Sequence, residues 1–279
     1  MLRNEECLKL AHIEEAALLA ESGAAGGDAA PAGSFVRVFY HAAPPAEILR
    51  REPTALAEAA LSMWRYAAQR TPGRPAIRML AAEGGRGLVQ IITDDMPFLV
   101  DSVSAALTRL GFEIDLVIHP VLGVTRDAAG RLTECAAGLA DGRKESMMQF
   151  ELIGDVGPER QATVVARLEA VLADVRAVVG AWPSMRGLVQ RMAQAIEAVP
   201  PPAAAGAAED AAFLRWLDDG NFLFLGYREY VLRGSELAVV AGAGKGLLQN
   251  DDVLVFDGLR ALTRRRRTCR PSCARRRSR

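Results

Sequence analysis

Two adjacent carboxylates follow a short apolar run and precede an amphipathic stretch. The run 88–92 predicts a strand, and apolar residues at helical spacing from Leu99 to Leu110 predict a helix. The turn between them consists of Thr93, Asp94, Asp95, Met96 and Pro97. A helix amino terminus attracts an anion, but Asp94 and Asp95 already place negative charge there. An incoming ammonium group therefore suits this candidate ligand-binding turn better than a phosphate.

The same two aspartates have a second interpretation, as caps of the helix. Aspartate is a preferred helix N-cap, and proline is well tolerated in the first turn. We therefore expect the helix to begin at Met96 or Pro97 with Asp95 as its cap. A capping role and a ligand contact both remain open for Asp94 and Asp95. Asp101 is interpreted as a solvated carboxylate on the helix face.

Other residues that could do chemistry lack the companions that they need. His119 lies on a predicted strand without a nucleophile or a second histidine nearby, which favours a hydrogen-bonded structural role. Cys269 and Cys273 have no histidine or second pair to complete a zinc site. The glycine-rich stretch 242–246 misses the spacing of nucleotide-binding loops and predicts a flexible turn. We therefore expect no catalytic residue, metal or cofactor in this chain.

The turn belongs to a longer alternation of strands and helices. Strands are predicted at 76–81, 87–93, 112–124 and 146–153, and helices at 96–110, 158–179 and 183–199. This β-α-β-β-α order is that of a ferredoxin-like domain. Its fourth strand is not visible, and 175–179 reads equally as strand or helix. Gly111 is predicted to end the helix that follows the turn.

Shorter segments flank this domain. A helix within residues 8–20 is followed by a Gly/Ala linker at 23–33, and residues 35–40 predict either a short strand or the start of a helix. After the linker that begins at the three prolines 200–202, a helix around 213–217 and a strand at 222–230 open a second unit.

Charge and composition restrict the cellular setting. The formal net charge is zero, but residues 264–279 hold nine arginines and no acid, which leaves 25 basic against 34 acidic residues before them. No apolar run approaches 18 residues, so no membrane span is predicted. Glutamates at positions 5, 6, 14 and 15 argue against a targeting peptide, and four scattered cysteines indicate a reducing compartment. We expect a soluble, cytoplasmic protein.

Several motifs resemble one family in the correct order. Residues 88–124 resemble an ACT domain, and DDMPFLVDSV with VIHPV is similar to the first ACT-like domain of the large bacterial NAD-specific glutamate dehydrogenases. Three further segments agree. They are FYHAAPPAEI with ALSMWRYAAQRTPG upstream, ESMMQFEL after the hairpin turn, and FLRWLDDGNFLFLGYREY downstream. The resemblance covers roughly residues 35–260. Phe98 departs from it, because ACT domains usually place a glycine there.

The resemblance implies a fold and a division of the chain. We expect an α+β fold, with a ferredoxin-like ACT-type domain (βαββαβ) that carries extra helices, followed by the start of a second α+β unit. The expected parts are a helix and linker (1–34), the ACT-like domain (35–200), a linker (201–210), an incomplete second unit (211–262) and an Arg-rich tail (263–279). The tail is interpreted as a frameshifted reading of the gene, or alternatively as a disordered arginine arm.

The resemblance also implies a function. The family oxidatively deaminates L-glutamate to 2-oxoglutarate with NAD, and its catalytic domains come later in the chain. We therefore expect a regulatory and assembly segment that is inactive by itself, responds to a small amino-acid effector and forms a homo-oligomer through ACT-type contacts. The alternative is a free-standing ACT-type sensor or protein-interaction module. A nucleic-acid partner through the arginine tail is the weaker hypothesis.

Overall fold

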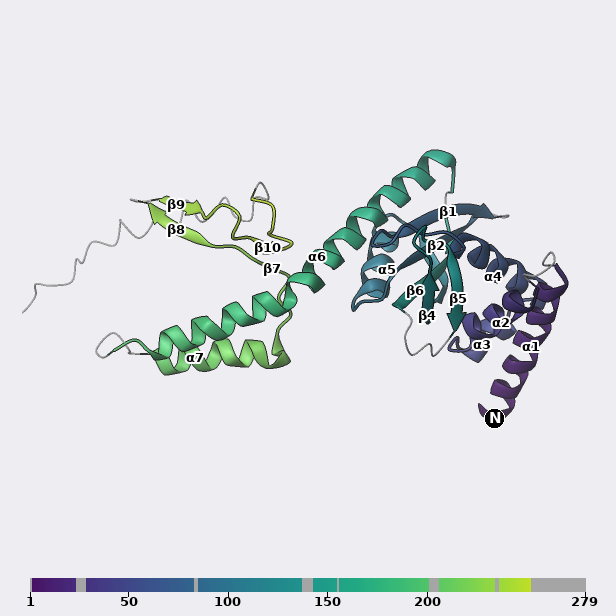
Figure 1. Cartoon of the computed structure of the whole chain (residues 1–279), viewed down its shortest axis with the longest axis horizontal. Coiled ribbons are helices and arrows are strands. Elements are labelled where there is room, and N and C mark those ends of the chain that lie inside the picture. The colour runs from purple at the N-terminus through teal and green to yellow at the C-terminus, as the bar shows by residue number, and fades with distance from the viewer. Residues whose placement is uncertain are drawn as a thin grey trace, which may run out of the picture. The chain divides into compact units, whose positions relative to one another are not determined.

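The computed structural model describes residues 2–23, 29–82, 85–136, 143–154, 156–200, 206–233 and 236–251. The chain divides into two compact units, Met1–Val175 and Arg176–Arg279. The first unit contains the predicted turn and the sheet that carries it (Figure 1). The Arg-rich tail with Cys269 and Cys273 lies outside the described residues.

A six-stranded antiparallel sheet forms the centre of the first unit. Its strands are β1 (Ala76–Ala82), β2 (Arg86–Asp94), β3 (Glu113–Ile118), β4 (Val121–Arg126), β5 (Leu132–Ala136) and β6 (Arg143–Ile153). They lie in the order β1-β2-β6-β4-β5, and β3 also pairs with β6. The mixed α/β architecture with this antiparallel sheet agrees with the expected ACT-type fold.

The predicted strand 112–124 is interrupted in the structure. Both β3 and β4 pair with β6, with Ile118 opposite Gln149 and Val121 opposite Ser146. The break falls at His119 and Pro120, because proline has no N–H to donate to a ladder. The carbonyl of Pro120 still accepts a hydrogen bond from the N–H of Met147, at 3.1 Å.

The edge position beside β2 is occupied by β1. In a βαββαβ sheet the last strand lies beside the first, and here β2 is the strand that precedes the turn and its helix. The hairpin partner β1 pairs with β2 along its whole length, from Ala76 opposite Ile92 to Ala82 opposite Arg86. Residues 175–179, the alternative for a last strand, belong to a helix. The edge strand β1 therefore precedes β2, the first strand of the expected domain, in the sequence.

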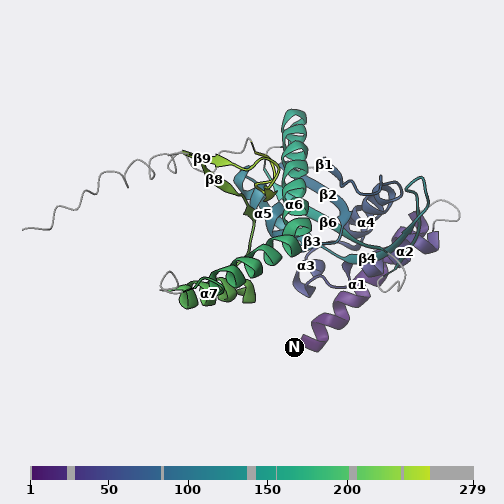
Figure 2. The ribbon, with the colours of Figure 1, turned by 60° about the vertical axis from the view of Figure 1, so that its left-hand side comes forward.

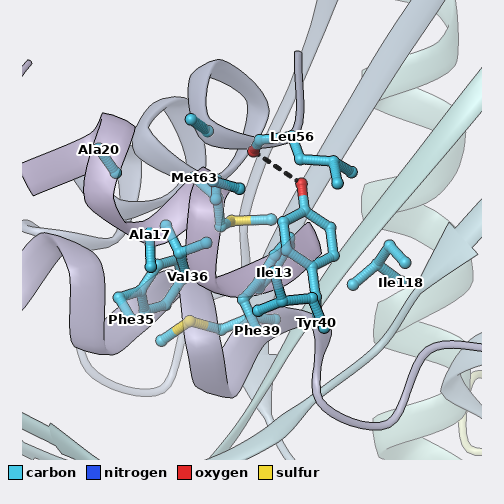
Figure 3. Packing of buried hydrophobic residues seen from close by; sticks show 14 of the residues in the cluster. Ile13, Ala17, Ala20, Phe35, Val36, Phe39, Tyr40, Leu56, Met63 and Ile118 are labelled. Carbon is cyan, nitrogen blue, oxygen red and sulfur yellow. Dashed lines mark hydrogen bonds between the residues drawn. The ribbon is translucent and has the colours of Figure 1, made fainter. Parts of the chain in front are cut away.

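Helices cover both faces of the sheet (Figures 1 and 2). On one face lie α1 (Leu2–Gly23), α2 (Ala29–Tyr40), α3 (Pro45–Leu49) and α4 (Pro53–Ala67). On the other lie α5 (Leu99–Arg109) and the first half of α6 (Pro158–Glu197). Figure 3 shows the core between the helical layer and the sheet, where the hydroxyl of Tyr40 donates to the carbonyl of Leu56 at 3.0 Å.

The expected linker at 23–33 is partly wrong. Helix α2 begins at Ala29, and the segment 35–40, for which strand and helix starts were both open, is its second half. Apolar residues at 32, 35, 36, 39 and 40 follow helical spacing and are all buried. Helix α1 packs on them through Ile13, Ala16 and Ala17. The amino-terminal helix is therefore part of the core of the first unit.

The two helices predicted at 158–179 and 183–199 are one helix. Helix α6 has 40 residues, with Pro183 inside it. An internal proline removes one backbone hydrogen bond and costs about 3 kcal/mol, yet α6 continues through it. The single proline Pro183 therefore does not mark the end of this helix.

The second unit contains small elements after α6. They are α7 (Ala207–Trp216), the π-helix η3 (Leu217–Asn221), β7 (Gly226–Tyr227), β8 (Tyr230–Arg233), β9 (Glu236–Val239) and β10 (Lys245–Gly246). The predicted strand 222–230 is mostly wrong, since β7 and β8 cover only its end. The predicted turn at 242–246 ends in β10. Among the described helices, none combines the length and apolar character needed to cross a membrane.

Candidate functional site

The predicted turn lies between β2 and α5, but the helix begins later than expected. Helix α5 starts at Leu99, its N-cap is Phe98, and no side chain caps it. The first helical hydrogen bond runs from the N–H of Ser102 to the carbonyl of Phe98, at 3.0 Å. The capping interpretation of Asp94 and Asp95 is therefore wrong, and their carboxylates interact with other partners.

The helix ends as predicted at Gly111. This glycine has a φ of +86°, which L side chains rarely adopt. Its N–H donates to the carbonyl of Thr108 at 2.9 Å, and the N–H of Phe112 donates to that of Leu107 at 3.2 Å. This pair of bonds is a Schellman motif, and the buried side chains of Leu107 and Phe112 accompany it. The end of α5 is thus closed by its own backbone groups.

Asp94 and Asp95 lie on opposite faces of the sheet, because successive residues of a strand alternate. The carboxylate of Asp94 accepts a hydrogen bond from Arg70 Nη2 at 2.8 Å, on the face covered by α1–α4. The carboxylate of Asp95 accepts one from the hydroxyl of Ser146 at 2.6 Å, on the face of α5. The candidate turn therefore presents two separate polar environments.

Asp95, Ser146 and His119 form a chain of hydrogen bonds. The Ser146 hydroxyl donates its proton to Asp95, so His119 Nε2 donates to the Ser146 oxygen at 3.1 Å. Burial lowers the pKa of His119 below the ordinary 6.5, and the negative charge of Asp95 partly opposes this shift. Because the serine proton points to the carboxylate, the histidine does not activate the hydroxyl. The geometry agrees with the predicted structural role of His119.

Asp94 borders a buried ion network. Arg70 Nη1 donates to Glu145 at 2.6 Å, and Arg126 donates to both carboxylate oxygens of Glu145 at 2.8 and 2.9 Å. The side chains of Arg70 and Glu145 are only 2% and 3% exposed. Charge-assisted hydrogen bonds of this kind are strong, and a buried pair of this kind is costly to break. The network holds the end of α4 and the strands β4 and β6 in a fixed arrangement.

A cavity of about 300 Å³ opens beside this network. Residues that line it include Arg70, Pro72, Asp94, Arg126, Arg143 and Glu145. Its charged lining makes it the best-equipped candidate site near the predicted turn. Arg143 pairs with Val124 through its backbone, but its exposed side chain has no hydrogen bond or ion pair within the part of the chain that the structure describes.

The five residues of the predicted turn contribute unequally. Asp94 lines the cavity, whereas Asp95 lies on the other face of the sheet. Thr93 is buried within the sheet opposite Ser146, Met96 is half-buried and Pro97 is exposed. Sequence reasoning missed Arg70, Arg126, Arg143 and Glu145. A usable signal existed for Glu145, since a charged residue opens the apolar strand ESMMQFEL.

Phe98 departs from ordinary backbone geometry. Its φ of +71° is the only positive φ of a non-glycine residue in the described segments, and its side chain is 42% exposed. A bulky residue at positive φ is strained. The backbone at this position therefore has a left-handed conformation that glycine adopts without strain.

A second cluster of polar side chains lies in the middle of the sheet face that α1–α4 cover. Gln90 Nε2 donates to Gln149 Oε1 at 3.0 Å, and Arg78 donates to Gln90 Oε1 while stacking over the ring of Tyr66. These contacts join the sheet to α4 and lie apart from the predicted turn. They read most simply as packing between the two layers.

Comparisons with known proteins agree with the motifs. Residues 35–168 match the family model "Glutamate dehydrogenase, ACT1 domain". The chain is 32% identical to the NAD-specific glutamate dehydrogenase of Halomonas elongata over 217 residues, which cover 74% of this chain and 14% of that protein. The Pseudomonas aeruginosa protein of the same name is 31% identical over 212 residues, covering 70% of this chain and 13% of that protein.

A third relative extends the similarity beyond these two. The NAD-specific glutamate dehydrogenase of Mycobacterium tuberculosis is 27% identical over 194 residues, which cover 67% of this chain and 12% of that protein. The chain thus spans 12–14% of the length of the curated relatives that it matches. At residues 35–168 it carries the ACT1 domain of the NAD-specific glutamate dehydrogenase family.

Proposed function

We propose that this chain is the regulatory and assembly segment of an NAD-specific glutamate dehydrogenase. The parent reaction would be the oxidative deamination of L-glutamate to 2-oxoglutarate, with NAD bound by another part of the enzyme. The ACT1 match at residues 35–168 and the three relatives named NAD-specific glutamate dehydrogenase support the proposal. The proposal includes a cytoplasmic location and a homo-oligomer formed through ACT-type contacts.

The regulatory part of the proposal is that a small amino acid binds at the turn Thr93–Pro97. The observation that carries it is the position of Asp94. Its carboxylate is 39% exposed at the edge of a charged cavity, where an ammonium group can reach it. Asp95, whose carboxylate accepts a hydrogen bond from the Ser146 hydroxyl on the other face, would hold the turn in place.

Calorimetry with each of the twenty common amino acids tests this proposal. We expect one or a few of them to bind the purified chain, and Asp94→Ala to weaken that binding at least tenfold, since an ammonium loses its carboxylate partner. Asp95→Ala serves as the comparison on the opposite face. If the folded chain binds no amino acid at all, the role of this segment is purely architectural and the regulatory proposal fails.

The alternative is a free-standing ACT-type sensor or protein-interaction module. The purified chain should reduce no NAD in the presence of glutamate under either proposal, so a second experiment is needed. The Halomonas elongata relative would be prepared without its matching segment and mixed with this chain. Association, with restored amino-acid dependence of NAD reduction, is expected of a regulatory segment. A chain that binds amino acids but never associates would favour the free-standing sensor.

A further inference from the structure

Strand β1 forms one margin of the sheet, and among the described strands it pairs only with β2 (Figure 1). The ladder between β2 and β6 continues past both ends of β2. There the N–H of Asp95 donates to the carbonyl of Lys144 at 3.0 Å, and the N–H of Gly154 donates to that of Gly85 at 3.1 Å. Bonding direction alternates along an antiparallel strand. The odd-numbered residues of β2 therefore bond to β6, and its even-numbered residues bond to β1.

The register identifies the main-chain groups of β1 that point away from the sheet. The pairing of β1 with β2 has no register shift and places Arg78 opposite Gln90, so the even-numbered residues of β1 bond to β2. The N–H and C=O groups of Ile77, Met79 and Ala81 point outward. No hydrogen bond joins these groups to another of the described residues. Strand β1 thus has three unused donor–acceptor pairs along one edge.

The other strands with an open edge, β3 and β5, have features that hinder pairing, and β1 lacks them. Strand β3 contains a register shift and the acidic residues Glu113 and Asp115. The ladder of β5 also contains a register shift, and its Glu134 is exposed. Bulges and charges of this kind protect a sheet edge from a second sheet. Strand β1 contains neither proline nor bulge, and its one charged side chain, Arg78, already donates to Gln90.

Strand β1 is complementary to the same strand of a second copy. In an antiparallel pair with Met79 opposite Met79 of the second copy, Ile77 lies opposite Ala81, so all three outward residues find partners. Arg78 then lies opposite Leu80, which has no charge. A register centred on Arg78 would instead place two guanidinium groups opposite each other, which destabilises a strand pair. The register centred on Met79 is therefore favoured.

We propose that two copies of this chain join their sheets through β1, in an antiparallel pair centred on Met79. The inference rests on the homo-oligomer of the proposed function and deepens it, because it names the surface that joins the copies. Both copies contribute the same strand, so the contact is isologous and limits assembly through β1 to two chains. A single pair of strands is a small interface, and the dimer is expected to form reversibly as the concentration rises.

Sedimentation equilibrium of the full chain over a range of concentrations tests the proposal with two substitutions of the exposed Ala81. Ala81→Pro removes an outward N–H, so no hydrogen bond within the sheet is lost. Ala81→Val is the matched control, since it keeps the N–H and suits a strand. We expect Ala81→Pro to raise the dimer dissociation constant at least tenfold, because symmetry removes the bond twice. Ala81→Val should leave the constant no higher than in the wild type.

Amide exchange of the wild-type chain, followed by NMR, gives a second measurement that needs no substitution. The N–H groups of Ile77, Met79 and Ala81 should exchange more slowly at high than at low protein concentration, because the second copy then accepts their hydrogen bonds. The N–H groups of Arg78 and Leu80 bond to β2 in both states and serve as internal controls. Exchange at the three outward positions that ignores protein concentration would overturn the proposal even if Ala81→Pro failed to fold.

The outcomes separate this inference from the function on which it rests. A dimer that Ala81→Pro and Ala81→Val affect equally would overturn the contact through β1, while the homo-oligomer of the proposed function would stand on another surface. A wild-type chain that stays monomeric at every concentration would overturn both the contact and a homo-oligomer formed by this segment. Amino-acid binding is measured separately by calorimetry, so the regulatory proposal can hold or fail in either case.

Discussion

Phe98 holds a backbone conformation that glycine alone takes without strain. L residues in the left-handed region cost about 1–2 kcal/mol, and Phe98 is fixed there by the turn before α5 and the helix after it. Its ring is 42% exposed, so burial offsets only part of that strain.

The strain at Phe98 predicts that replacement by glycine leaves a more stable chain than replacement by alanine, which is the reverse of the usual order in a helix. Phe98→Gly and Phe98→Ala both remove the ring, but only glycine relaxes at a φ of +71°. We expect Phe98→Gly to be more stable than Phe98→Ala by about 1 kcal/mol in urea unfolding. In an ordinary helical position the alanine variant would be the more stable one, so that order would contradict the left-handed backbone.

His119 predicts a loss of stability in weak acid. Burial lowers its pKa in the folded chain below the ordinary 6.5, so protonation favours the unfolded chain. This contribution is present above pH 6.5 and is lost as the pH falls through the folded-state pKa. In urea unfolding from pH 7.5 to 5, the stability difference between the wild type and His119→Gln should shrink toward acid. A difference that stays constant would mean that the imidazole keeps its ordinary pKa.

For single residues, the sequence identified the candidate turn but not the distant residues that interact with its aspartates. The strand-to-helix change in periodicity identified the turn, but both aspartates were expected at one candidate site, whereas the structure places them on opposite faces of the sheet. Arg70 is 24 residues from Asp94 and 75 from Glu145 in the chain, so no local pattern connects them. The capping prediction failed because Ser146, 51 residues away from Asp95, takes the carboxylate that local rules assigned to the helix.

Among the elements, the hairpin between β4 and β5 depends on one glycine. Gly130 has a φ of +83°, and its carbonyl accepts hydrogen bonds from the N–H of Arg70 and from Arg126. A Cβ built at this glycine would lie 2.0 Å from the Arg70 carbonyl oxygen. The hairpin thus approaches the end of α4 more closely than any side chain permits.

Two glycine-to-alanine changes separate backbone strain from lack of space. Gly111 has nearly the same φ, +86°, but a Cβ there would meet only Arg160 Nη2, at 3.9 Å. We expect Gly111→Ala to cost about 1 kcal/mol of unfolding free energy from strain alone. Gly130→Ala should cost about 2–4 kcal/mol, because the hairpin must also move. Equal losses in the two variants would show that the close approach at Gly130 relaxes freely.

The elements near the turn were predicted better than those at the ends of the chain. Strands β1, β2 and β6 and helix α5 have strong periodicity and glycine punctuation, and they lie close to their predicted positions, although α5 begins later and β6 earlier than expected. The elements whose bounds were predicted wrongly lack an unambiguous sequence signal at their ends. Pro183 read as a break although α6 continues through it, and residues 29–33 read as a linker although α2 begins there.

For the whole molecule, the tryptophans report separately on the two units. Trp64 lies in the first unit, whereas Trp182 and Trp216 lie in the second. Among the residues that the structure describes, most of the buried apolar core belongs to the first unit, while Phe213, Trp216 and Phe222 of the second are more than half exposed. The second unit therefore has less buried apolar surface to stabilise it.

Fluorescence should resolve two unfolding transitions. The Trp182→Phe/Trp216→Phe variant reports on the first unit through Trp64, and Trp64→Phe reports on the second. We expect the second unit to unfold at the lower urea concentration, since less apolar surface is buried there. Coincident transitions in the two variants would mean that the chain unfolds as a single cooperative unit.

The position of β1 also affects how the chain is made. All six strands of the sheet lie between Ala76 and Ile153, because the strand that pairs with the edge of β2 is β1, which precedes it in the sequence. Once β6 has emerged from the ribosome, the growing chain therefore contains all the strands of this sheet that the described residues form, and helix α6 follows directly. The edge of β2 is therefore paired by a strand made before it, and its backbone N–H and C=O groups need not wait for a later strand. This order of synthesis shortens the time in which a nascent β2 could pair with the wrong partner.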